Sequence, residues 1–184
     1  MLHIRERVDE LRMKEKSFSF DNVLNDLETS IEDFGVKVYY SDMSAFPDPE
    51  KVSGYTMFNK KGEPEIIVNA NEPEGRRRFT MAHELGHIIL HWGWPEKEVK
   101  DDFMTILYRQ DSYYTDYKSE KEANEFAAQL LAPLDVIEQV LIEPISSYDS
   151  QSQDFLSYRI ADAFNITKSF ANVQLDKLGK YQNV

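Results

Sequence analysis

Two histidines and a glutamate in the stretch RRRFTMAHELGHIILHWGW (residues 76–94) have the types and spacing of a metal-dependent hydrolytic site. His83, Glu84 and His87 form the pattern H-E-x-x-H. Residues four apart lie on one face of a helix, so the two imidazoles can converge on one ion. Glu84 projects beside them, where it can act as a general base on water. The pattern predicts a zinc-type site, although histidines on the surface of a helix would be spaced in the same way.

The third metal ligand must be a carboxylate from another segment. The chain has no cysteine, which leaves imidazole and carboxylate groups to bind a transition metal. His91 lies about 12 Å along the helix axis from His83, too far to bind the same ion. We therefore expect His91 to have a structural or supporting role, and we assign no role to His3.

Two glutamates in SEKEANEFAAQLLAP (residues 119–133) compete for the third position. This segment predicts a helix with a buried stripe formed by Ala123, Phe126, Ala127, Leu130 and Leu131. Glu120 shares the inward face with Asn124, which could hydrogen-bond a histidine ligand. Glu122 could instead form a capping box with Ser119 at the start of the helix. We predict Glu120 as the ligand and keep Glu122 as the alternative.

The segments around these residues predict an α+β fold with a small three-stranded sheet. Strand-like patterns occupy residues 36–41, 53–59 and 65–70. The turn KKGEP suits a hairpin between the last two strands. The stretch EKEVKDDFMTILY could be helical, whereas the tyrosine-rich residues that follow it read as a loop.

The histidine helix is expected to begin at Asn71 or Glu72 and to end before Gly93. Small Gly86 and Ala82 would let this helix approach the sheet closely. The sheet should therefore pack on the helix that carries the histidines.

Further helices are expected on both sides of this core. The segment MLHIRERVDELRMKEK predicts a charged helix, and Asp21 and Gly35 would cap and end the next one. Pro133 can start another helix, and two short helices at about 154–164 and 168–179 close the chain. We predict an N-terminal helical segment (1–20), a core (21–144) and a helical tail packed on the core (145–184).

Composition and charge limit the classes of function. The chain has 184 residues, of which 41% are hydrophobic, as is typical of a globular protein. Its net charge of −12 disfavours nucleic acid as a partner. No apolar run approaches the ~18 residues that span a bilayer, and no signal-like segment opens the chain. These features predict a cytoplasmic protein without a membrane partner.

The histidine stretch, followed by EKEANEFAAQLLAP, resembles the ImmA/IrrE metallopeptidases. The resemblance covers roughly Phe34 to Gly179. The family pattern E-x-x-A-N-x-F-A falls on Glu120, Ala123, Asn124, Phe126 and Ala127, which supports Glu120 over Glu122. Ala132 departs from the family, in which Met often precedes the proline that ends the helix.

This resemblance implies a zincin-like fold and a zinc metallo-endopeptidase with one Zn²⁺ per chain. His83, His87 and Glu120 would hold the metal, Glu84 would be the catalytic base, and Asn124 would support a ligand. The family also implies a specific protein substrate, a helix-turn-helix repressor of a phage, mobile element or stress regulon. Its members are cytoplasmic proteins of bacteria or phages.

An oxyanion also needs a donor, and four tyrosines are candidates: Tyr55, Tyr113, Tyr114 and Tyr117. For each of them taken singly, a place at the surface or the rim of the core is the simpler interpretation.

A competing interpretation starts from the tail LSYRIADAFNITKSFANVQLDKLG, which has a helix-turn-helix pattern. Lys168, Lys177 and Lys180 could contact phosphates, and Asn172 and Gln174 could read bases. The chain would then be a zinc-containing DNA-binding regulator. A third possibility is a protein that acts by binding a partner without catalysis.

Overall fold

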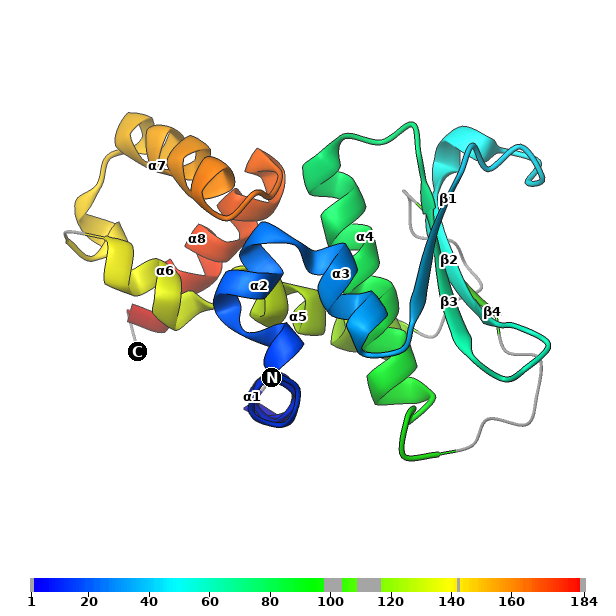
Figure 1. The fold of residues 1–184 in the computed structure, drawn as a ribbon. Helices are drawn as coiled ribbons and strands as arrows, with labels where there is room; N and C mark the ends of the chain where they lie inside the picture. The colour runs from blue at the N-terminus through cyan, green and yellow to red at the C-terminus, as the bar shows by residue number, and fades with distance from the viewer. Residues whose placement is uncertain (1, 98–103, 109–116, 142, 183–184) are drawn as a thin grey trace.

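A computed structural model describes residues 2–97, 104–108, 117–141 and 143–182. The predicted α+β class is confirmed, with helices packed on a small mixed sheet (Figure 1). The sheet lies at one end of the molecule and the C-terminal helices at the other. Helices α4 (Glu74–Gly86) and α5 (Tyr117–Leu131) lie between these two parts.

The sheet has four strands in the order β1-β3-β2-β4. Their bounds are Lys37–Ser41 for β1, Val52–Phe58 for β2, Pro64–Asn69 for β3 and Met104–Tyr108 for β4. Strand β1 pairs parallel with β3, whereas β2 pairs antiparallel with both β3 and β4. The three predicted strands and the hairpin turn are confirmed, and Asn59 N–H donates to the Glu63 carbonyl across that turn.

Strand β4 corrects the helix considered for EKEVKDDFMTILY over its last five residues, whereas residues 98–103 lie outside the described part of the chain. Its five residues, MTILY, include β-branched and aromatic side chains that favour a strand. A short apolar run cannot be assigned to helix or strand by periodicity, because both would bury it. Here the run is a strand because it pairs with β2.

The N-terminal part contains α1 (Leu2–Lys14) and a 3₁₀ turn, Lys16–Phe18. The single helix predicted next is instead two, α2 (Phe20–Asn25) and α3 (Leu27–Asp33). Asp26 separates them because its carboxylate accepts a hydrogen bond from Thr29 N–H and caps α3. Ser19 caps α2, so the prediction of Asp21 as N-cap is wrong. The predicted stop at Gly35 is confirmed by its φ of 99°.

Helix α4 begins at Glu74, two or three residues later than predicted, because Pro73 takes an extended conformation as its N-cap. It continues into a π-helical segment, His87–His91, in which Trp92 N–H bonds to the His87 carbonyl at 3.1 Å. Gly93 follows with a φ of 71°, as expected of a helix stop.

Close approaches on its two sides hold α4 in place. Toward the sheet, a Cβ added to Gly54 would lie 2.4 Å from Thr80 Cγ2. Toward α5, a Cβ added to Gly86 would lie 3.2 Å from both Ala123 Cα and Phe126 Cβ. The prediction that Gly86 serves the contact with the sheet is therefore wrong, because Gly86 faces α5. The helix with the histidines and the helix with the glutamates consequently pack backbone to backbone.

The remaining helices are α6 (Leu134–Val140), α7 (Ser150–Ala163) and α8 (Lys168–Gln182), with 3₁₀ turns at Pro49–Lys51 and Ile145–Ser147. Both predicted tail helices are present. The first begins earlier than expected because the Asp149 carboxylate accepts from Ser152 N–H at 2.7 Å and caps it.

Direct contacts join the tail to the rest of the molecule. The Gln174 amide is buried and donates to the Ala132 carbonyl at 2.6 Å. Lys177 Nζ lies 2.8 Å from a Glu125 carboxylate oxygen on α5. Helix α8 therefore contacts α5, which carries the predicted third ligand, and the residue that follows it.

The main core is an apolar cluster that runs between α1, the inner sheet face, α4, α5 and the tail. A smaller cluster of Met43, Val52 and Ile67 lies on the other face of the sheet. Within the described ranges, no helix has both the length and the apolar character to cross a membrane.

Candidate metal centre

The structure brings together the three residues predicted as metal ligands. His83 lies on α4, His87 opens the π-helical segment and Glu120 lies in the first turn of α5. Their nitrogen and oxygen atoms all lie within 4.8 Å of one another. The two Nε2 atoms are 3.0 Å apart, and each lies 3.3 Å from an oxygen of Glu120. The close packing of α4 on α5 makes this convergence possible.

Both imidazoles are buried, with 0% of His83 and 3% of His87 exposed. Asn124 Oδ1 accepts a hydrogen bond from His83 Nδ1 at 3.0 Å, which leaves the lone pair of His83 on Nε2. Burial lowers the pKa of His87, with a further lowering from His83 and partial opposition from its hydrogen bond to Glu120. The neutral form that this favours is the one that binds a metal.

Glu120 is held in its ionised form. Burial alone would raise the pKa of this carboxyl, but hydrogen bonds and charge interactions with His83 and His87 outweigh it and lower the pKa to about 2. Two neutral imidazoles and one carboxylate are the donor set of many catalytic zinc sites. The residues present therefore fit a divalent metal ion.

Glu84 is fully buried, and neither of its carboxylate oxygens has a hydrogen-bond partner among the described residues. Burial, and next the negative charge of Glu120, raise its pKa well above the usual value. An unsatisfied buried carboxylate costs free energy, so its presence calls for an explanation beyond stability. Its position next to His83 in the chain makes it the candidate for proton transfer.

His91 lies outside this three-residue cluster, and Glu122 does too. His91 Nδ1 is 2.9 Å from His87 Nδ1, and His91 Nε2 is 3.3 Å from a Glu122 oxygen. Ser119 lies inside α5 and not at its N-cap, because the helix already includes Tyr117, and Glu122 faces His91. Sequence reasoning missed this pair, although a histidine one turn after His87 was a signal for it.

Burial lowers the pKa of His91, and so does His87, while Glu122 opposes the change. A neutral His91 has one N–H and one acceptor nitrogen.

Neither of the two described candidate tyrosines is positioned as an oxyanion donor. Tyr55 pairs with Ile67 and packs with Phe46 in the smaller cluster, on the sheet face away from α4. The Tyr117 side chain is 69% exposed, with Lys121 over its ring. Tyr113 and Tyr114 lie outside the described residues.

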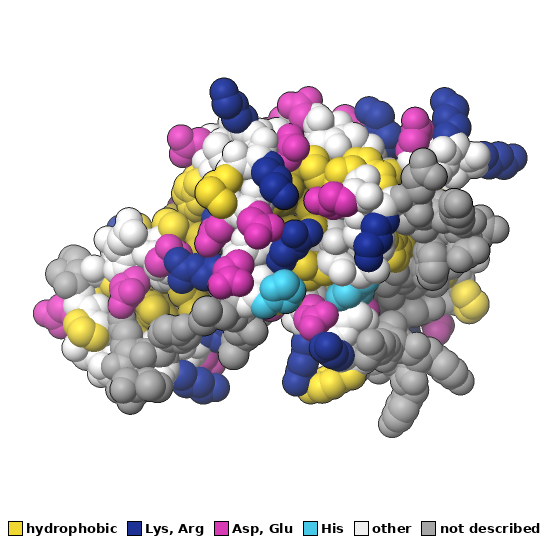
Figure 2. Space-filling model, turned by 90° about the horizontal axis from the view of Figure 1, so that it is seen from below, with side chains coloured by type: hydrophobic (Ala, Val, Ile, Leu, Met, Phe, Trp, Pro, Cys, Tyr) yellow, Lys and Arg dark blue, Asp and Glu magenta, His cyan; other side chains and the backbone are white. Residues whose placement is uncertain are grey.

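Charged side chains lie near histidine side chains that reach the surface of the molecule. On the face drawn in Figure 2, histidine side chains (cyan) are visible between carboxylates and lysine or arginine side chains. His91, with 21% of its side chain exposed, connects the buried cluster to the surface.

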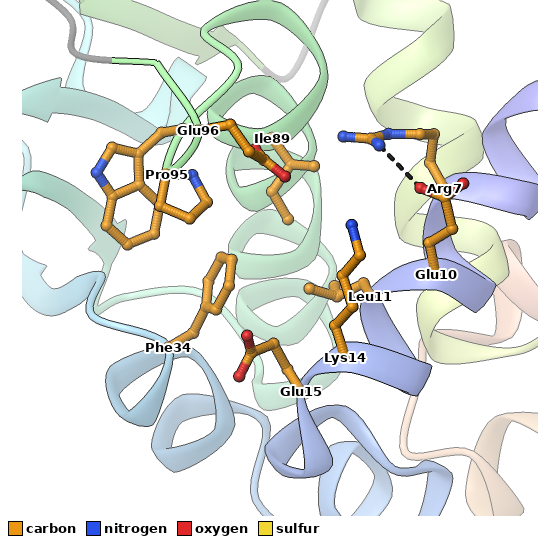
Figure 3. A pocket seen from close by; sticks show the side chains of 10 residues that line it. Arg7, Glu10, Leu11, Lys14, Glu15, Phe34, Ile89, Pro95 and Glu96 are labelled. Carbon is orange, nitrogen blue, oxygen red and sulfur yellow. Dashed lines mark hydrogen bonds and ion pairs between the residues drawn. The ribbon is translucent and has the colours of Figure 1, made fainter.

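A separate pocket of about 60 Å³ lies between α1 and the turn after the π-helical segment (Figure 3). Its lining consists of Arg7, Glu10, Leu11, Lys14, Glu15, Phe34, Ile89, Trp94, Pro95 and Glu96. Arg7 and Glu10 form an ion pair at its edge, with 2.9 Å between nitrogen and oxygen. None of the clustered residues contributes to it, so this pocket is distinct from the candidate metal centre.

The site combines an H-E-x-x-H motif with a glutamate from a second helix. Comparison with known families agrees, since the Peptidase M78 model, described as the IrrE N-terminal-like domain, matches residues 31–176. The chain belongs to this ImmA/IrrE family, as its motifs predicted.

The chain is also similar to "Uncharacterized immunity region protein 2" of Bacillus phage phi105. The two are 33% identical over 89 residues, which is 48% of this chain and 50% of the phage protein. The match thus spans about half the length of that relative.

Proposed function

We propose that the chain is a zinc-dependent metallo-endopeptidase that hydrolyses a peptide bond in a specific protein substrate. The observation that carries this proposal is the convergence of His83, His87 and Glu120 within 4.8 Å. Glu84 supplies a buried carboxylate without a partner among the described residues. Membership of a metallopeptidase family supports the same class of reaction.

Each residue has a defined role in this proposal. His83, His87 and Glu120 would hold Zn²⁺, which when bound supplies a Lewis acid that lowers the pKa of water and polarises a carbonyl. Glu84 accepts a proton from water as the new C–O bond forms. It then donates that proton to the amine nitrogen as the C–N bond breaks. Asn124 keeps His83 in the tautomer that presents Nε2.

The proposed substrate is a helix-turn-helix repressor of a phage, mobile element or stress regulon, cleaved in the cytoplasm. The family resemblance supports this substrate. So does the phage relative, whose name places it in an immunity region. An extended segment of the substrate could pair with β4, an outer strand of the described sheet.

The DNA-binding alternative is less well supported by the tail. Gln174, a proposed base reader, is buried and bonded to the Ala132 carbonyl. Lys177 pairs with a glutamate, and Lys168 lies 2.6 Å from an Asp154 oxygen. These side chains already have partners within the protein.

The metal site is tested by the zinc content of the purified protein after reconstitution with excess zinc. We expect about one zinc per chain, as in other single-metal catalytic sites. Glu120→Ala should lose it, whereas Glu122→Ala should keep it at saturating zinc. A wild type without zinc, or full zinc in the Glu120→Ala variant, would refute the proposed ligand set.

Catalysis is tested separately with Glu84→Gln. This variant should bind zinc like the wild type but should no longer cleave a repressor encoded near the gene. The loss should be at least about 100-fold, the lower range for a general base. Cleavage at the wild-type rate would remove Glu84 from the mechanism. Loss of cleavage with full biological activity would favour a protein that acts by binding alone.

A further inference from the structure

Three side chains form a hydrogen-bonded series that leads from the surface to the metal-binding atoms. Glu122 Oε2 lies 3.3 Å from His91 Nε2, and His91 Nδ1 lies 2.9 Å from His87 Nδ1. The far nitrogen of His87, Nε2, faces the other two members of the cluster. His91 uses one ring nitrogen for its contact with Glu122 and the other for its contact with His87, so the series continues through its ring.

The carboxylate sets the direction of every hydrogen bond in this series. A carboxylate oxygen accepts, so His91 Nε2–H must donate to Glu122. A neutral His91 then has its lone pair on Nδ1, which accepts a hydrogen bond from His87 Nδ1–H. His87 is left with its lone pair on Nε2, the atom that points into the cluster.

The opposite arrangement is unfavourable. If His91 Nδ1 donated to His87, a neutral His91 would turn the lone pair of Nε2 toward a Glu122 oxygen. The lone pair of His87 would also lie on Nδ1, away from the cluster. Two lone pairs facing each other at 3.3 Å repel, so Glu122 favours the tautomer in which His87 can bind a metal. Until a metal takes up the lone pair on His87 Nε2, Glu120, whose oxygen lies 3.3 Å from that nitrogen, favours the opposite tautomer.

From this geometry we infer that Glu122 and His91 are positioning residues that fix the tautomer and ring orientation of His87 and so strengthen metal binding. The inference rests on the proposed metal site. It gives Glu122 and His91 a purpose without contact with the metal or the substrate. Partners of this kind typically change metal affinity 10–100-fold.

The two histidines of the cluster are supported in different ways. His83 Nδ1 bonds to the amide oxygen of Asn124, which is on α5. His87 Nδ1 bonds to an imidazole on its own helical segment, which in turn bonds to a carboxylate on α5. Both supports end on α5, so the helix that supplies Glu120 also orients the two imidazoles.

The test compares two substitutions of nearly equal size, His91→Leu and His91→Asn. Asparagine can place an amide oxygen close to the position of Nδ1, as Asn124 does for His83, whereas leucine offers no acceptor. We expect His91→Leu to raise the Kd for zinc 10–100-fold, measured by competition with a chromophoric chelator. His91→Asn should remain close to the wild-type value.

A second readout needs no metal. The ¹⁵N chemical shifts of the His87 ring in the metal-free protein report which nitrogen carries the proton. We expect a larger fraction of Nδ1–H in the wild type and in His91→Asn than in His91→Leu, in which only Glu120 is left to accept a hydrogen bond from the His87 ring. Leucine and asparagine variants with the same Kd and the wild-type tautomer would overturn the inference.

Glu122→Ala should weaken zinc binding in the same way, and Glu125→Ala is its matched control. Glu125 lies on the same helix but pairs with Lys177 rather than with a histidine. Equal zinc affinities of these two variants would exclude a role for Glu122. If the wild type bound no zinc, the proposed function would fail, and the ring shifts would still decide whether Glu122 and His91 set the tautomer.

Discussion

At the scale of single residues, two neighbouring carboxyl groups have opposite surroundings. Glu120 lies 3.3 Å from each of two imidazoles, and its interactions with them lower its pKa to about 2. Glu84 is buried without a hydrogen-bond partner among the described residues, and its pKa is raised, first by burial and then by Glu120. Pairs of groups with pKa values driven apart often have separate acid and base roles. Here one carboxylate suits a metal ligand and the other suits a proton acceptor.

The raised pKa of Glu84 predicts that Glu84→Gln stabilises the metal-free protein at neutral pH. Between pH 4.5 and the folded pKa, the folded chain keeps a proton that the unfolded chain has released, so stability falls as pH rises. Glutamine cannot ionise and avoids this loss. Its advantage should reach at least about 1 kcal/mol at pH 7, as expected for a buried unsatisfied group. Urea unfolding at several pH values measures the difference.

The difference should disappear well below pH 4.5, where the wild-type carboxyl keeps its proton in both the folded and the unfolded state. Glu120→Gln provides a comparison of opposite sign. The lowered pKa of Glu120 contributes stability above pH 4.5, and this contribution is lost as the pH falls toward 2. A destabilising effect of Glu84→Gln at pH 7 would contradict the stated cause of its pKa shift.

At the scale of elements, the contact between α4 and α5 determines whether the site can exist. Two ligands come from α4 and its π-helical extension, and the third comes from α5. Gly86 lies at their closest approach, against Ala123 and Phe126. The distance between the two histidines and Glu120 therefore depends on Gly86, which has no side chain to keep the helices apart.

We expect Gly86→Val to force the two helices apart. Overpacking of this kind costs about 1–3 kcal/mol of unfolding free energy. Zinc affinity should also fall, because Glu120 moves away from the histidines. Chemical denaturation and chelator competition measure the two effects. Lys121→Val places the same side chain on the exposed face of α5. It should change neither the unfolding free energy nor the free energy of zinc binding by more than about 0.5 kcal/mol. Equal results for both variants would exclude close packing as the cause.

At the scale of the whole molecule, the tail is joined to the other parts. Arg78 on α4 donates to the Val23 carbonyl of α2 and to the Asn165 carbonyl between α7 and α8, at 2.8 and 3.1 Å. The family match extends from residue 31 to 176 and so includes most of the tail. The division into segments 1–20, 21–144 and 145–184 stays a prediction.

We expect the protein not to bind DNA, even at low salt. Its net charge is −12, and Gln174 and two of the candidate lysines are bonded within the protein. Electrophoretic mobility shifts with DNA from the region around the gene measure this, and the cognate repressor serves as the positive control. A salt-dependent shift with a defined DNA sequence would return the tail to a role in DNA recognition.

The sequence by itself determined the local features of the site. Helical periodicity places His83 and His87 on one face, whatever surrounds them. The absence of cysteine required a carboxylate, and the apolar stripe of α5 directed Glu120 inward. Three strands followed from their alternation and their turn residues. These features depend on neighbours within a few positions, which the sequence contains directly.

Tertiary structure decided the features that depend on distant partners. MTILY becomes a strand because β2 offers it an edge, and Gly86 faces α5 because that helix packs there. His91 meets Glu122 across 31 positions of the chain. Periodicity assigns each of these residues to a face but does not identify what lies opposite. The packing of the core determines that, since it brings distant elements to within hydrogen-bond distance.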